Sequence, residues 1–387
     1  HEVHVVTALP WYRDHQVDPG WGGKLVHYER TPWGSITRIH PFPAKSKANL
    51  LLRTGAFVAF SVIAGVRAVA VRRHTGRDAR VQHRGVDAVV AMSPPLTLGT
   101  IGWLVARLRR TRLIFNVQDV FPDAAIATGA VRNKLIIALA SWLERFTYRR
   151  ASAVVVLSPD LQRNVRNKIG AKLAERVHVI ENFVDVAGIT PQDRMTPYRH
   201  ELGIGTEVVV MYAGNVGFSQ SLELLVEFAR RTPQVTVLIN GAGVALASLR
   251  ARAADVANVR FGEYQPEARL AEVLATGDIH VVSLRAGLAS VSVPSKTYSI
   301  LAASRCVVAA VDRDTEIDRL VTRAGAGICV APDDVDALCA ALGSLVGDPA
   351  RRLALGSAGR TYVEQHPTAR DVAGAYVRLL PDSLSNS

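Results

Sequence analysis

The 387-residue sequence has little cysteine, few aromatic residues (6%) and no long uncharged apolar run. Its three cysteines, Cys306, Cys329 and Cys339, are too few and too widely spaced for a disulfide framework or a zinc site. They favour a reducing, cytoplasmic location, and we expect Cys306 and Cys329 to be core residues because they lie in apolar runs. The sequence also lacks low-complexity tracts and solenoid repeats, so it predicts an ordinary globular protein.

No apolar run is long enough and free enough of charge to span a bilayer. Residues 50–71 come nearest, but Arg53 and Arg67 interrupt this segment, and Lys45 and Lys47 precede it. The pattern predicts an amphipathic helix that packs against the core or lies in a membrane interface, and it favours the core.

Acidic residues are scarce in the N-terminal half. Residues 1–190 hold 27 Lys and Arg against 13 Asp and Glu, a net charge of +14, whereas residues 191–387 hold 19 against 21, a net charge of −2. Such a basic half attracts an anionic membrane surface or a phosphorylated acceptor, or is simply a solvated surface. Nucleic acid is not an expected partner, because no recognition-helix, zinc or aromatic RNA-binding signature accompanies the charge. The arginine cluster at residues 107–112 fits lipid phosphate or a solvated helix end equally well.

Apolar runs rich in Val and Ile alternate with helical patterns along both halves, which predicts α/β architecture with parallel sheets covered on both faces. The first half offers strands at residues 3–7, 86–91, 113–117 and 153–157. The second half offers strands at residues 208–212, 235–240, 259–261, 279–283, 307–311 and 328–330. We therefore expect two doubly wound domains, with ligands in the cleft at the carboxyl ends of the strands.

Domain boundaries follow from polar, proline-containing stretches. We expect an N-terminal domain over residues 1–190, a C-terminal domain over 191–367, and a final segment, 368–387, whose helix returns to the first domain. The chain opens on His1 and enters a strand almost at once, so we expect that a first strand, glycine loop and helix are missing.

Two short segments indicate an anion site. Lys296 lies where a loop becomes a helix, and backbone N–H groups at a helix start favour phosphate. Gly214 and Gly217 follow an apolar strand and form a turn that lets backbone approach a ligand closely. The two segments together predict a diphosphate site. Gly241 and Gly243 do not make a dinucleotide fingerprint, because Leu246 replaces its third glycine.

The chain resembles the family 4 glycosyltransferases of GT-B fold, in particular the branch with the colanic-acid and O-antigen enzymes that resemble fucosamine transferases. The segments that carry this resemblance are residues 1–7, 93–95, 116–123, 181–185, 212–217 and 293–296. The resemblance implies two Rossmann-like domains facing a central cleft. It also implies that a sugar moves from a nucleotide diphosphate sugar to a lipid-linked or polysaccharide acceptor, with retention of configuration and without a metal or other cofactor.

The resemblance assigns the donor to the C-terminal domain and makes Lys296 the group that stabilises the departing diphosphate. The expected donor residues are Gly214, Asn215, Gly217, Gln220, Glu263, Tyr264, Ser295, Lys296, Tyr298 and Ser299. The chain departs from the family at Val291 and Ser299, where many members carry two glutamates, the second of which holds the ribose. A serine offers one hydroxyl rather than a bidentate acceptor.

Acceptor residues are expected in the N-terminal domain. Asp119 follows a strand and would accept or position the acceptor hydroxyl, or it caps a turn. Trp11, Tyr12 and His15 follow the opening strand and would meet a sugar, although a packed surface loop explains them as well. The expected location is cytoplasmic, peripheral at the inner face of the plasma membrane.

Other functions remain open at this point. An epimerase of the same architecture would need closely spaced acids and bases, and the sequence shows no such paired carboxylates. A degenerate scaffold that binds a nucleotide sugar without turnover is compatible with Ser299 and with the early start of the chain.

Overall fold

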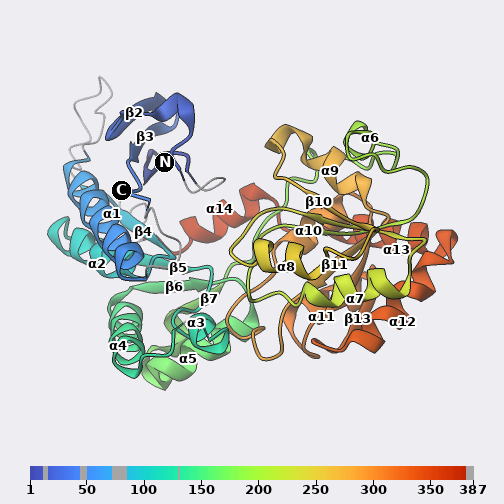
Figure 1. Cartoon of the computed structure of the whole chain (residues 1–387). Coiled ribbons are helices and arrows are strands. Elements are labelled where there is room, and N and C mark those ends of the chain that lie inside the picture. The colour runs from blue at the N-terminus through green and yellow to red at the C-terminus, as the bar shows by residue number, and fades with distance from the viewer. Residues whose placement is uncertain (12–15, 44–49, 72–84, 130, 381–387) are drawn as a thin grey trace.

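The computed structural model describes the chain except residues 12–15, 44–49, 72–84, 130 and 381–387. Two lobes lie side by side, the N-terminal lobe on the left of Figure 1 and the C-terminal lobe on the right. The chain leaves the N-terminal lobe after residue 179 and has joined the C-terminal lobe by Thr196, whose hydroxyl hydrogen-bonds that of Thr276 (2.6 Å).

The described part of the N-terminal lobe contains two sheets. In the first, β1 (Val3–Ala8) pairs in parallel with β3 (Gly34–Ile39), and β2 (Val26–Thr31) pairs antiparallel with β3. The second is fully parallel. Its order is β4 (Ala88–Ser93), β5 (Arg112–Val117), β6 (Ala153–Val156) and β7 (Val177–Val179).

Helices pack around both sheets of this lobe, and the first of them packs on the first sheet. They are α1 (Leu50–Ala70), α2 (Thr97–Leu108), α3 (Asp123–Ala127), α4 (Lys134–Arg150) and α5 (Pro159–Ile169). Side chains fix two of their starts: Asn133 accepts hydrogen bonds from the N–H groups of Leu135 and Ile136, and Ser158 accepts one from that of Leu161. Three-residue and six-residue 3₁₀ turns, η1 (Pro19–Trp21) and η2 (Ala171–Arg176), precede β2 and β7.

The C-terminal lobe has the predicted doubly wound form. Its six parallel strands run in the order β10, β9, β8, β11, β12, β13. Their bounds are β8 (Val209–Ala213), β9 (Thr236–Asn240), β10 (Val259–Gly262), β11 (Ile279–Ser283), β12 (Cys306–Ala310) and β13 (Gly327–Val330). The strand order reverses at β8, between β9 and β11, which is the point where such sheets bind ligands.

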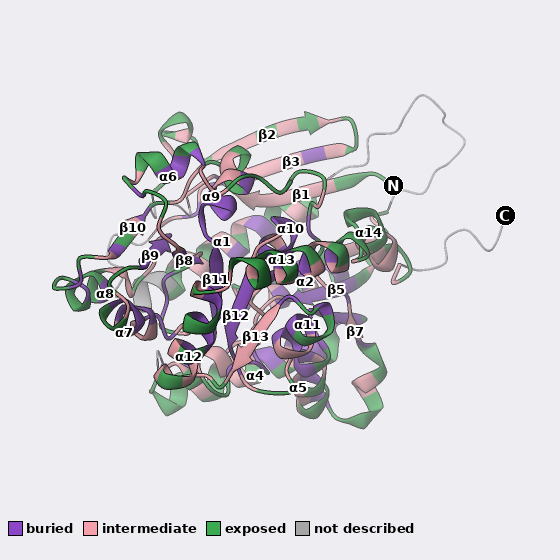
Figure 2. Cartoon of the chain, turned by 90° about the vertical axis from the view of Figure 1, so that its right-hand side faces the viewer, coloured by how far each residue is buried: buried purple, intermediate pink, exposed green. Residues whose placement is uncertain are grey.

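Helices cover both faces of this sheet, and Figure 2 shows the buried strands β11 and β12 behind them. The helices are α6 (Pro197–Glu201), α7 (Glu223–Arg231), α8 (Leu246–Arg252), η3 (Glu267–Arg269), α9 (Leu270–Thr276), α10 (Lys296–Ala302), α11 (Glu316–Ala324), α12 (Val335–Val346) and α13 (Pro349–Glu364). Cys306 is buried in one hydrophobic cluster of this lobe, and the partly buried Cys329 packs against another.

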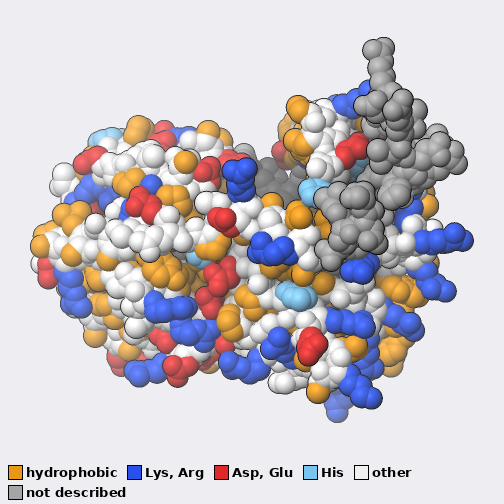
Figure 3. Space-filling model, turned by 180° about the vertical axis from the view of Figure 1, so that it is seen from behind, with side chains coloured by type: hydrophobic (Ala, Val, Ile, Leu, Met, Phe, Trp, Pro, Cys, Tyr) orange, Lys and Arg blue, Asp and Glu red, His pale blue; other side chains and the backbone are white. Residues whose placement is uncertain are grey.

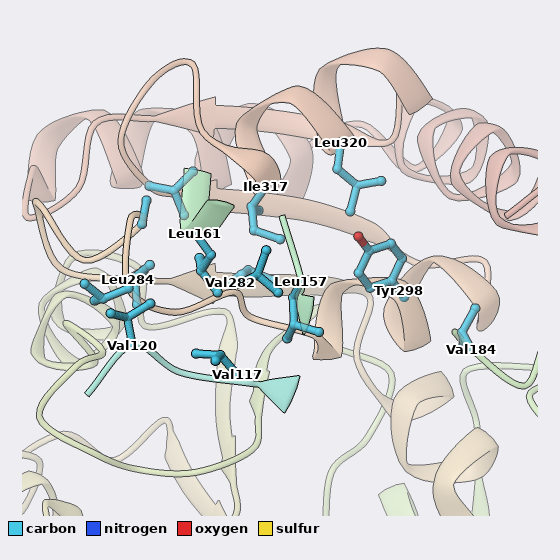
Figure 4. Packing of buried hydrophobic residues seen from close by; sticks show 14 of the residues in the cluster. Val117, Val120, Leu157, Leu161, Val184, Val282, Leu284, Tyr298, Ile317 and Leu320 are labelled. Atoms are coloured by element: carbon cyan, nitrogen blue, oxygen red, sulfur yellow. The ribbon is translucent and has the colours of Figure 1, made fainter. Parts of the chain in front are cut away.

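A shared hydrophobic core joins the two lobes. Figure 4 shows Val117, Val120 and Leu161 of the N-terminal lobe against Val282 and Leu284 of the C-terminal lobe. Polar contacts cross the same interface. The N–H of Val120 donates to the carbonyl of Val291 (2.8 Å), and the Arg319 guanidinium pairs with Asp160 (2.7 Å). Burial of apolar surface fixes the lobes against each other along this side.

The last helix, α14 (Ala369–Val377), lies against the N-terminal lobe. Val372, Ala375 and Tyr376 pack on buried residues of β5 and β6, and the Asn116 amide donates to the Tyr376 hydroxyl (2.5 Å). The chain thus crosses between the lobes twice. Within the described residues, no helix has the length and apolarity needed to span a membrane.

Candidate functional site

Glycine-rich loops follow the carboxyl ends of β8, β9 and β10 and lie against one another. Gly214 and Gly241 adopt φ angles of +142° and +147°, which only glycine adopts readily. A Cβ atom on Gly241 would lie 1.9 Å from the Gly214 carbonyl oxygen, so these two backbones require glycine. The Gly214 N–H donates to the Asn240 carbonyl (2.9 Å), and the Gly241 N–H donates to the Gly262 carbonyl (2.9 Å).

Lys296 is the first residue of α10, and its side chain reaches these loops. Its ammonium lies 3.7 Å from the centre of the Tyr212 ring, and a Cβ atom on Gly214 would come within 2.8 Å of it. The structure therefore brings together Lys296 and Gly214, which the sequence predicts for one site. Since α10 has only seven residues, the lysine charge itself, rather than a long helix dipole, carries the positive potential here.

The surroundings of Lys296 disfavour its charged form, because desolvation is not offset by a nearby carboxylate among the described residues. Desolvation lowers its pKa to about 7. Within the part of the chain that the structure describes, no carboxylate forms an ion pair with its ammonium. A cation in such a place gains most from an anion that enters from outside, because the anion replaces the lost hydration.

Tyr212 is a site residue that sequence analysis missed. Its ring faces the Lys296 ammonium in a cation–π contact, and its hydroxyl donates to the Asn215 carbonyl (2.6 Å). Burial raises the Tyr212 pKa well above its usual range, and Tyr264 adds to this shift electrostatically. The position at the end of β8, two residues before Gly214, is the signal that would have identified it.

Asn215, Gly217 and Gln220 form a compact turn after β8. The Gln220 side-chain oxygen accepts a hydrogen bond from the Gly217 N–H (3.1 Å). A Cβ atom on Gly217 would lie 2.9 Å from the Asn215 amide nitrogen, so this side chain folds over the glycine. Gln220 thus supports the turn from within, while Asn215 is exposed at its surface.

Glu263 and Tyr264 follow β10 and lie at the same sheet edge. Glu263 is exposed, and its carbonyl accepts a hydrogen bond from the Tyr198 hydroxyl (3.4 Å). That hydroxyl also donates to the Asn240 side chain, which ties the ends of β9 and β10 together. Tyr198, on α6, was not predicted from the sequence, because the residues that its hydroxyl contacts lie more than 40 positions away in the sequence.

The serines near Lys296 are accessible. Ser295 is exposed, and its side chain does not cap α10. Ser299 is half-buried, one turn along the same helix. Both hydroxyls are thus near the lysine in the chain and reachable from solvent.

Tyr298 requires a correction. Its side chain is 3% exposed and lies in the core shared by the lobes, with its ring stacked on His366 at a centroid distance of 4.6 Å. The His366 ring also hydrogen-bonds the Asn182 carbonyl (2.9 Å). The two segments that connect the lobes, one near residue 182 and one near residue 366, therefore meet here. Tyr298 therefore packs in the core and does not line the site. Tyr298 and Lys296 are two residues apart on α10, so their side chains point to different sides of the helix.

Asp119 lies at the boundary between the lobes. Burial raises its pKa, and a hydrogen bond with the Ser292 hydroxyl acts in the opposite direction. Ser292 belongs to the loop that leads into α10, four residues before Lys296. The partly buried carboxylate therefore links the N-terminal lobe to the loop that leads into α10.

The acceptor residues predicted after β1 are described only in part. Trp11 is half-buried, whereas Tyr12 and His15 lie outside the described residues. His280 is a further buried group near the lysine. Burial lowers its pKa to about 4, its Nε2 hydrogen-bonds the Leu274 carbonyl (2.8 Å), and its Nδ1 has no partner among the residues that the structure describes. The imidazole is therefore neutral at pH 7.

A pocket of about 800 Å³ opens elsewhere between the lobes, and none of the predicted donor residues lines it. It lies between α5 and the loops at residues 287–290 and 312–315. Seen from behind in Figure 3, the molecule is also hollowed at its upper edge between the lobes. Among the described residues, no cluster of three His, Cys, Asp or Glu side chains is placed to hold a metal ion.

Comparison with known families decides the class of this site. Residues 1–182 match the family described as "Glycosyl transferase 4-like domain", and residues 207–348 match "Glycosyl transferases group 1". The chain is a family 4 glycosyltransferase. The second match contains the glycine loops and Lys296, so the features that hold the site together belong to the family region.

Two bacterial proteins named as glycosyltransferases are similar to most of the chain. The chain is 27% identical over 88% of its length to the putative colanic acid biosynthesis glycosyl transferase WcaI of Escherichia coli, and it covers 83% of that protein. It is 24% identical over 77% of its length to the probable glycosyltransferase WbjE of Pseudomonas aeruginosa, of which it covers 72%.

Solved structures show the same two-lobed GT-B fold. Sucrose-phosphate synthase from Thermosynechococcus elongatus superposes with a TM-score of 0.72 at 18% identity, over 98% of this chain and 88% of that one. HepE of Anabaena, in complex with UDP and glucose, gives a TM-score of 0.66 at 14% identity, over 83% of this chain and 80% of that one. At these identities the likeness establishes the fold alone.

Proposed function

We propose that this glycosyltransferase moves a sugar from a nucleotide diphosphate sugar to a lipid-linked or polysaccharide acceptor, with retention of configuration and without a metal, in cell-surface glycan synthesis at the cytoplasmic face of the membrane. The observation that carries the proposal is the half-buried Lys296, whose ammonium lacks a carboxylate partner among the described residues and lies beside Gly214 in the loop after β8.

Lys296 stabilises the leaving group. As the bond between the sugar and the diphosphate breaks, negative charge grows on the phosphate oxygen, and an ammonium fixed beside it lowers the energy of that state. A positioned donor of this kind contributes about 3 kcal/mol or more to transition-state stabilisation. Gly214 and Gly217 allow the phosphates to approach the backbone, and the hydroxyls of Ser295 and Ser299 offer further hydrogen bonds.

Asn215, Glu263 and Tyr264 line the donor side, at the ends of β8 and β10. The Asn215 amide is exposed and suits phosphate or sugar hydroxyls, whereas Glu263 and Tyr264 suit the nucleoside. The acceptor enters from the N-terminal lobe, where Asp119 positions its hydroxyl and Trp11, Tyr12 and His15 contact it. Asp119 requires ionisation for this role, and its raised pKa places it nearer the range of a general base.

The relatives support this choice of substrates. One similar protein is named for colanic acid biosynthesis. Another, from Mycolicibacterium smegmatis, is named a GDP-mannose-dependent alpha-(1-6)-phosphatidylinositol monomannoside mannosyltransferase. The match to this second protein is 30% identical and spans 46% of this chain and 49% of that protein. The second name specifies a lipid-linked acceptor and a nucleotide sugar. HepE was solved with UDP and with UDP-glucose.

Thermal stability against a panel of nucleoside diphosphates and nucleotide sugars tests the donor proposal. A ligand at 100 times its dissociation constant adds about 2.7 kcal/mol to the stability of the folded state. We expect one nucleotide to raise the melting temperature selectively in the wild type and much less in Lys296→Ala. A panel with no stabilising nucleotide contradicts the proposal.

A scaffold that binds a nucleotide sugar without turnover is the second candidate. The observation that favours it is the absence of carboxylates at Val291 and Ser299, because a serine holds a ribose with one hydrogen bond at most instead of a bidentate pair. The two candidates separate when the stabilising nucleotide sugar is incubated with a membrane glycolipid extract. Release of the nucleoside diphosphate identifies the transferase, and binding without release identifies the scaffold.

A further inference from the structure

Helix α4 exposes its apolar side chains and buries polar ones. Leu135, Leu139 and Trp142 follow a spacing that aligns them along one side of the helix, and they are 79%, 64% and 59% exposed. The buried positions of the same helix are Glu144, Thr147 and Tyr148. A helix whose outer side faces water has the opposite arrangement, with its apolar stripe toward the core.

The two neighbouring helices repeat this feature. Helix α1 packs against α2, and α2 packs against α4. Exposed valines line α1 at Val58, Val62, Val66 and Val69, and exposed leucines lie on α2 at Leu104 and Leu108. Helix α1 also buries a polar residue, Ser61, whose hydroxyl hydrogen-bonds that of Thr97 (2.7 Å).

We call the exposed apolar residues of these three helices the outer helical face. Its large apolar residues are Val58, Val62, Val66, Val69, Leu104, Leu108, Leu135, Ile136, Leu139 and Trp142. Figure 1 shows α1, α2 and α4 on the side of the N-terminal lobe that points away from the C-terminal lobe. Exposed apolar area collected in this way marks an interaction surface.

Aromatic rings and an arginine border this face. Trp142 stacks on Phe146 with a centroid distance of 5.6 Å, and Phe146 meets Trp103 of α2 edge to face at 5.1 Å. The Arg150 guanidinium lies 5.5 Å from the centre of the Phe146 ring. A shallow groove of about 730 Å³ runs along α4 beside these rings. Tryptophan with arginine is the combination that suits the boundary between lipid headgroups and acyl chains.

The charge on the three helices has one sign at the surface. Glu144 is their single acidic residue, and it is 1% exposed and paired with Lys168 (2.7 Å). Among the side chains of these helices that the structure describes, the exposed charged ones are Arg67, Arg107, Lys134, Arg145, Arg149 and Arg150. Figure 3 shows Lys and Arg side chains among apolar ones over the lower part of the N-terminal lobe. This charge complements an anionic surface, whereas a second copy docked through the same face would place arginine against arginine.

We propose that the outer helical face docks this protein on an anionic lipid bilayer, with α4 lying in the plane of the headgroups. Leu135, Leu139 and Trp142 enter the interface, while Arg145 and Arg149 contact lipid phosphates. The proposal extends the proposed function, because a bilayer is where a lipid-linked acceptor is found. Binding to a bilayer depends only on this surface, so it can be measured in the absence of any sugar transfer.

Vesicle sedimentation tests the proposal with the full chain. We expect the wild type to sediment with vesicles of phosphatidylcholine and phosphatidylglycerol and to bind vesicles of phosphatidylcholine alone at least tenfold more weakly. Salt should weaken the binding to anionic vesicles. The double variant Leu139→Asn/Trp142→Ser should lose at least tenfold in partition, and Arg149→Gln should lose severalfold, with unchanged melting temperatures.

Matched controls come from the C-terminal lobe. Leu353 on α13 is 70% exposed, and Arg351 is exposed beside it, so Leu353→Asn and Arg351→Gln remove similar groups outside the face. Both should bind vesicles as the wild type does. Lys296→Ala should also bind normally, which separates docking from catalysis. The proposal is overturned if neither vesicle binds the wild type, if the control variants lose as much as the face variants, or if the face variants abolish only self-association.

Discussion

The Lys296 ammonium rests against the face of the Tyr212 ring, with 3.7 Å between the nitrogen and the ring centre. The Tyr212 hydroxyl is bonded to the Asn215 carbonyl, so the ring cannot turn away without breaking that contact. A π face stabilises a cation in part but does not neutralise it, as a carboxylate would. The lysine is therefore held in place while its charge stays available to an incoming diphosphate.

Binding of a nucleotide sugar should weaken above about pH 7. Burial lowers the Lys296 pKa to about 7 in the free protein, and a bound diphosphate favours the charged form and raises this pKa in the complex. Above the lower pKa, binding takes up a proton, so Kd should rise by up to about tenfold per pH unit. Calorimetric titration over a pH series, in buffers of different ionisation enthalpy, measures both effects. A Kd and a proton uptake that do not change with pH would contradict this assignment. Lys296→Arg, which stays charged, should flatten the profile.

Tyr212→Leu should impair nucleotide binding more than Tyr212→Phe does. Phenylalanine keeps the ring against Lys296 and loses the hydrogen bond to Asn215, which costs about 1 kcal/mol of stability. Leucine loses both the hydrogen bond and the cation–π contact, which is worth about 2 kcal/mol when desolvated. Urea denaturation and nucleotide titration of both variants measure the two effects. Equal nucleotide affinity in the two variants would show that the ring does not position the lysine.

Gly214→Ala should abolish nucleotide binding. The new methyl group would lie 2.8 Å from the Lys296 ammonium, in a backbone conformation with φ of +142°. Gly287→Ala is the matched control, because Gly287 also has a positive φ (+80°) but has no atom within 4 Å of its added Cβ. Both variants should lose about 1 kcal/mol of stability or more, since alanine is strained at either site. Nucleotide affinity should fall in Gly214→Ala alone, and an equal fall in both would assign the effect to backbone strain.

Asp119→Asn should lower turnover by about 100-fold while leaving nucleotide affinity unchanged. The substitution removes the proton acceptor that the acceptor hydroxyl requires, and general-base groups contribute about 100-fold to 10,000-fold. Asp123→Asn is the control, because Asp123 pairs with Lys168 (2.8 Å) and should change stability rather than turnover. Turnover with the donor identified by thermal stabilisation, together with urea denaturation, separates the two. Wild-type turnover in Asp119→Asn would leave Asp119 with a structural role.

Much of the C-terminal lobe was predictable because its strands are continuous apolar runs. The predicted strand at residues 279–283 has the bounds of β11, and those at 208–212 and 307–311 differ from β8 and β12 by one residue. Sheets covered on both faces produce such runs, whose ends are marked by glycine or polar residues. These marked ends also allowed the sequence to predict Gly214 just after β8 and Lys296 at the start of α10.

The N-terminal lobe was harder to predict for a physical reason. Strands β2 and β3 form an antiparallel hairpin in which apolar and polar residues are mixed, as in Val26–Thr31, so no continuous run marks them. The turn with Pro32, Trp33 and Gly34, where Gly34 has a φ of +146°, was the available signal. Tyr198 and Ser292 were missed because each acts through a contact that only tertiary packing creates, whereas the place of Tyr212 at the end of β8 was an available signal. The inward direction of Tyr298 was missed likewise, because adjacent helical residues differ in which side they face.

The turnover of Lys296→Ala with the identified nucleotide sugar tests the central claim most directly. The substitution removes the positive charge at the departing diphosphate and leaves the glycine loops and the Tyr212 ring in place. We predict a loss of at least about 100-fold in kcat, with an unchanged far-ultraviolet circular dichroism spectrum. Turnover within about twofold of the wild type would contradict the claim that this lysine stabilises the leaving group.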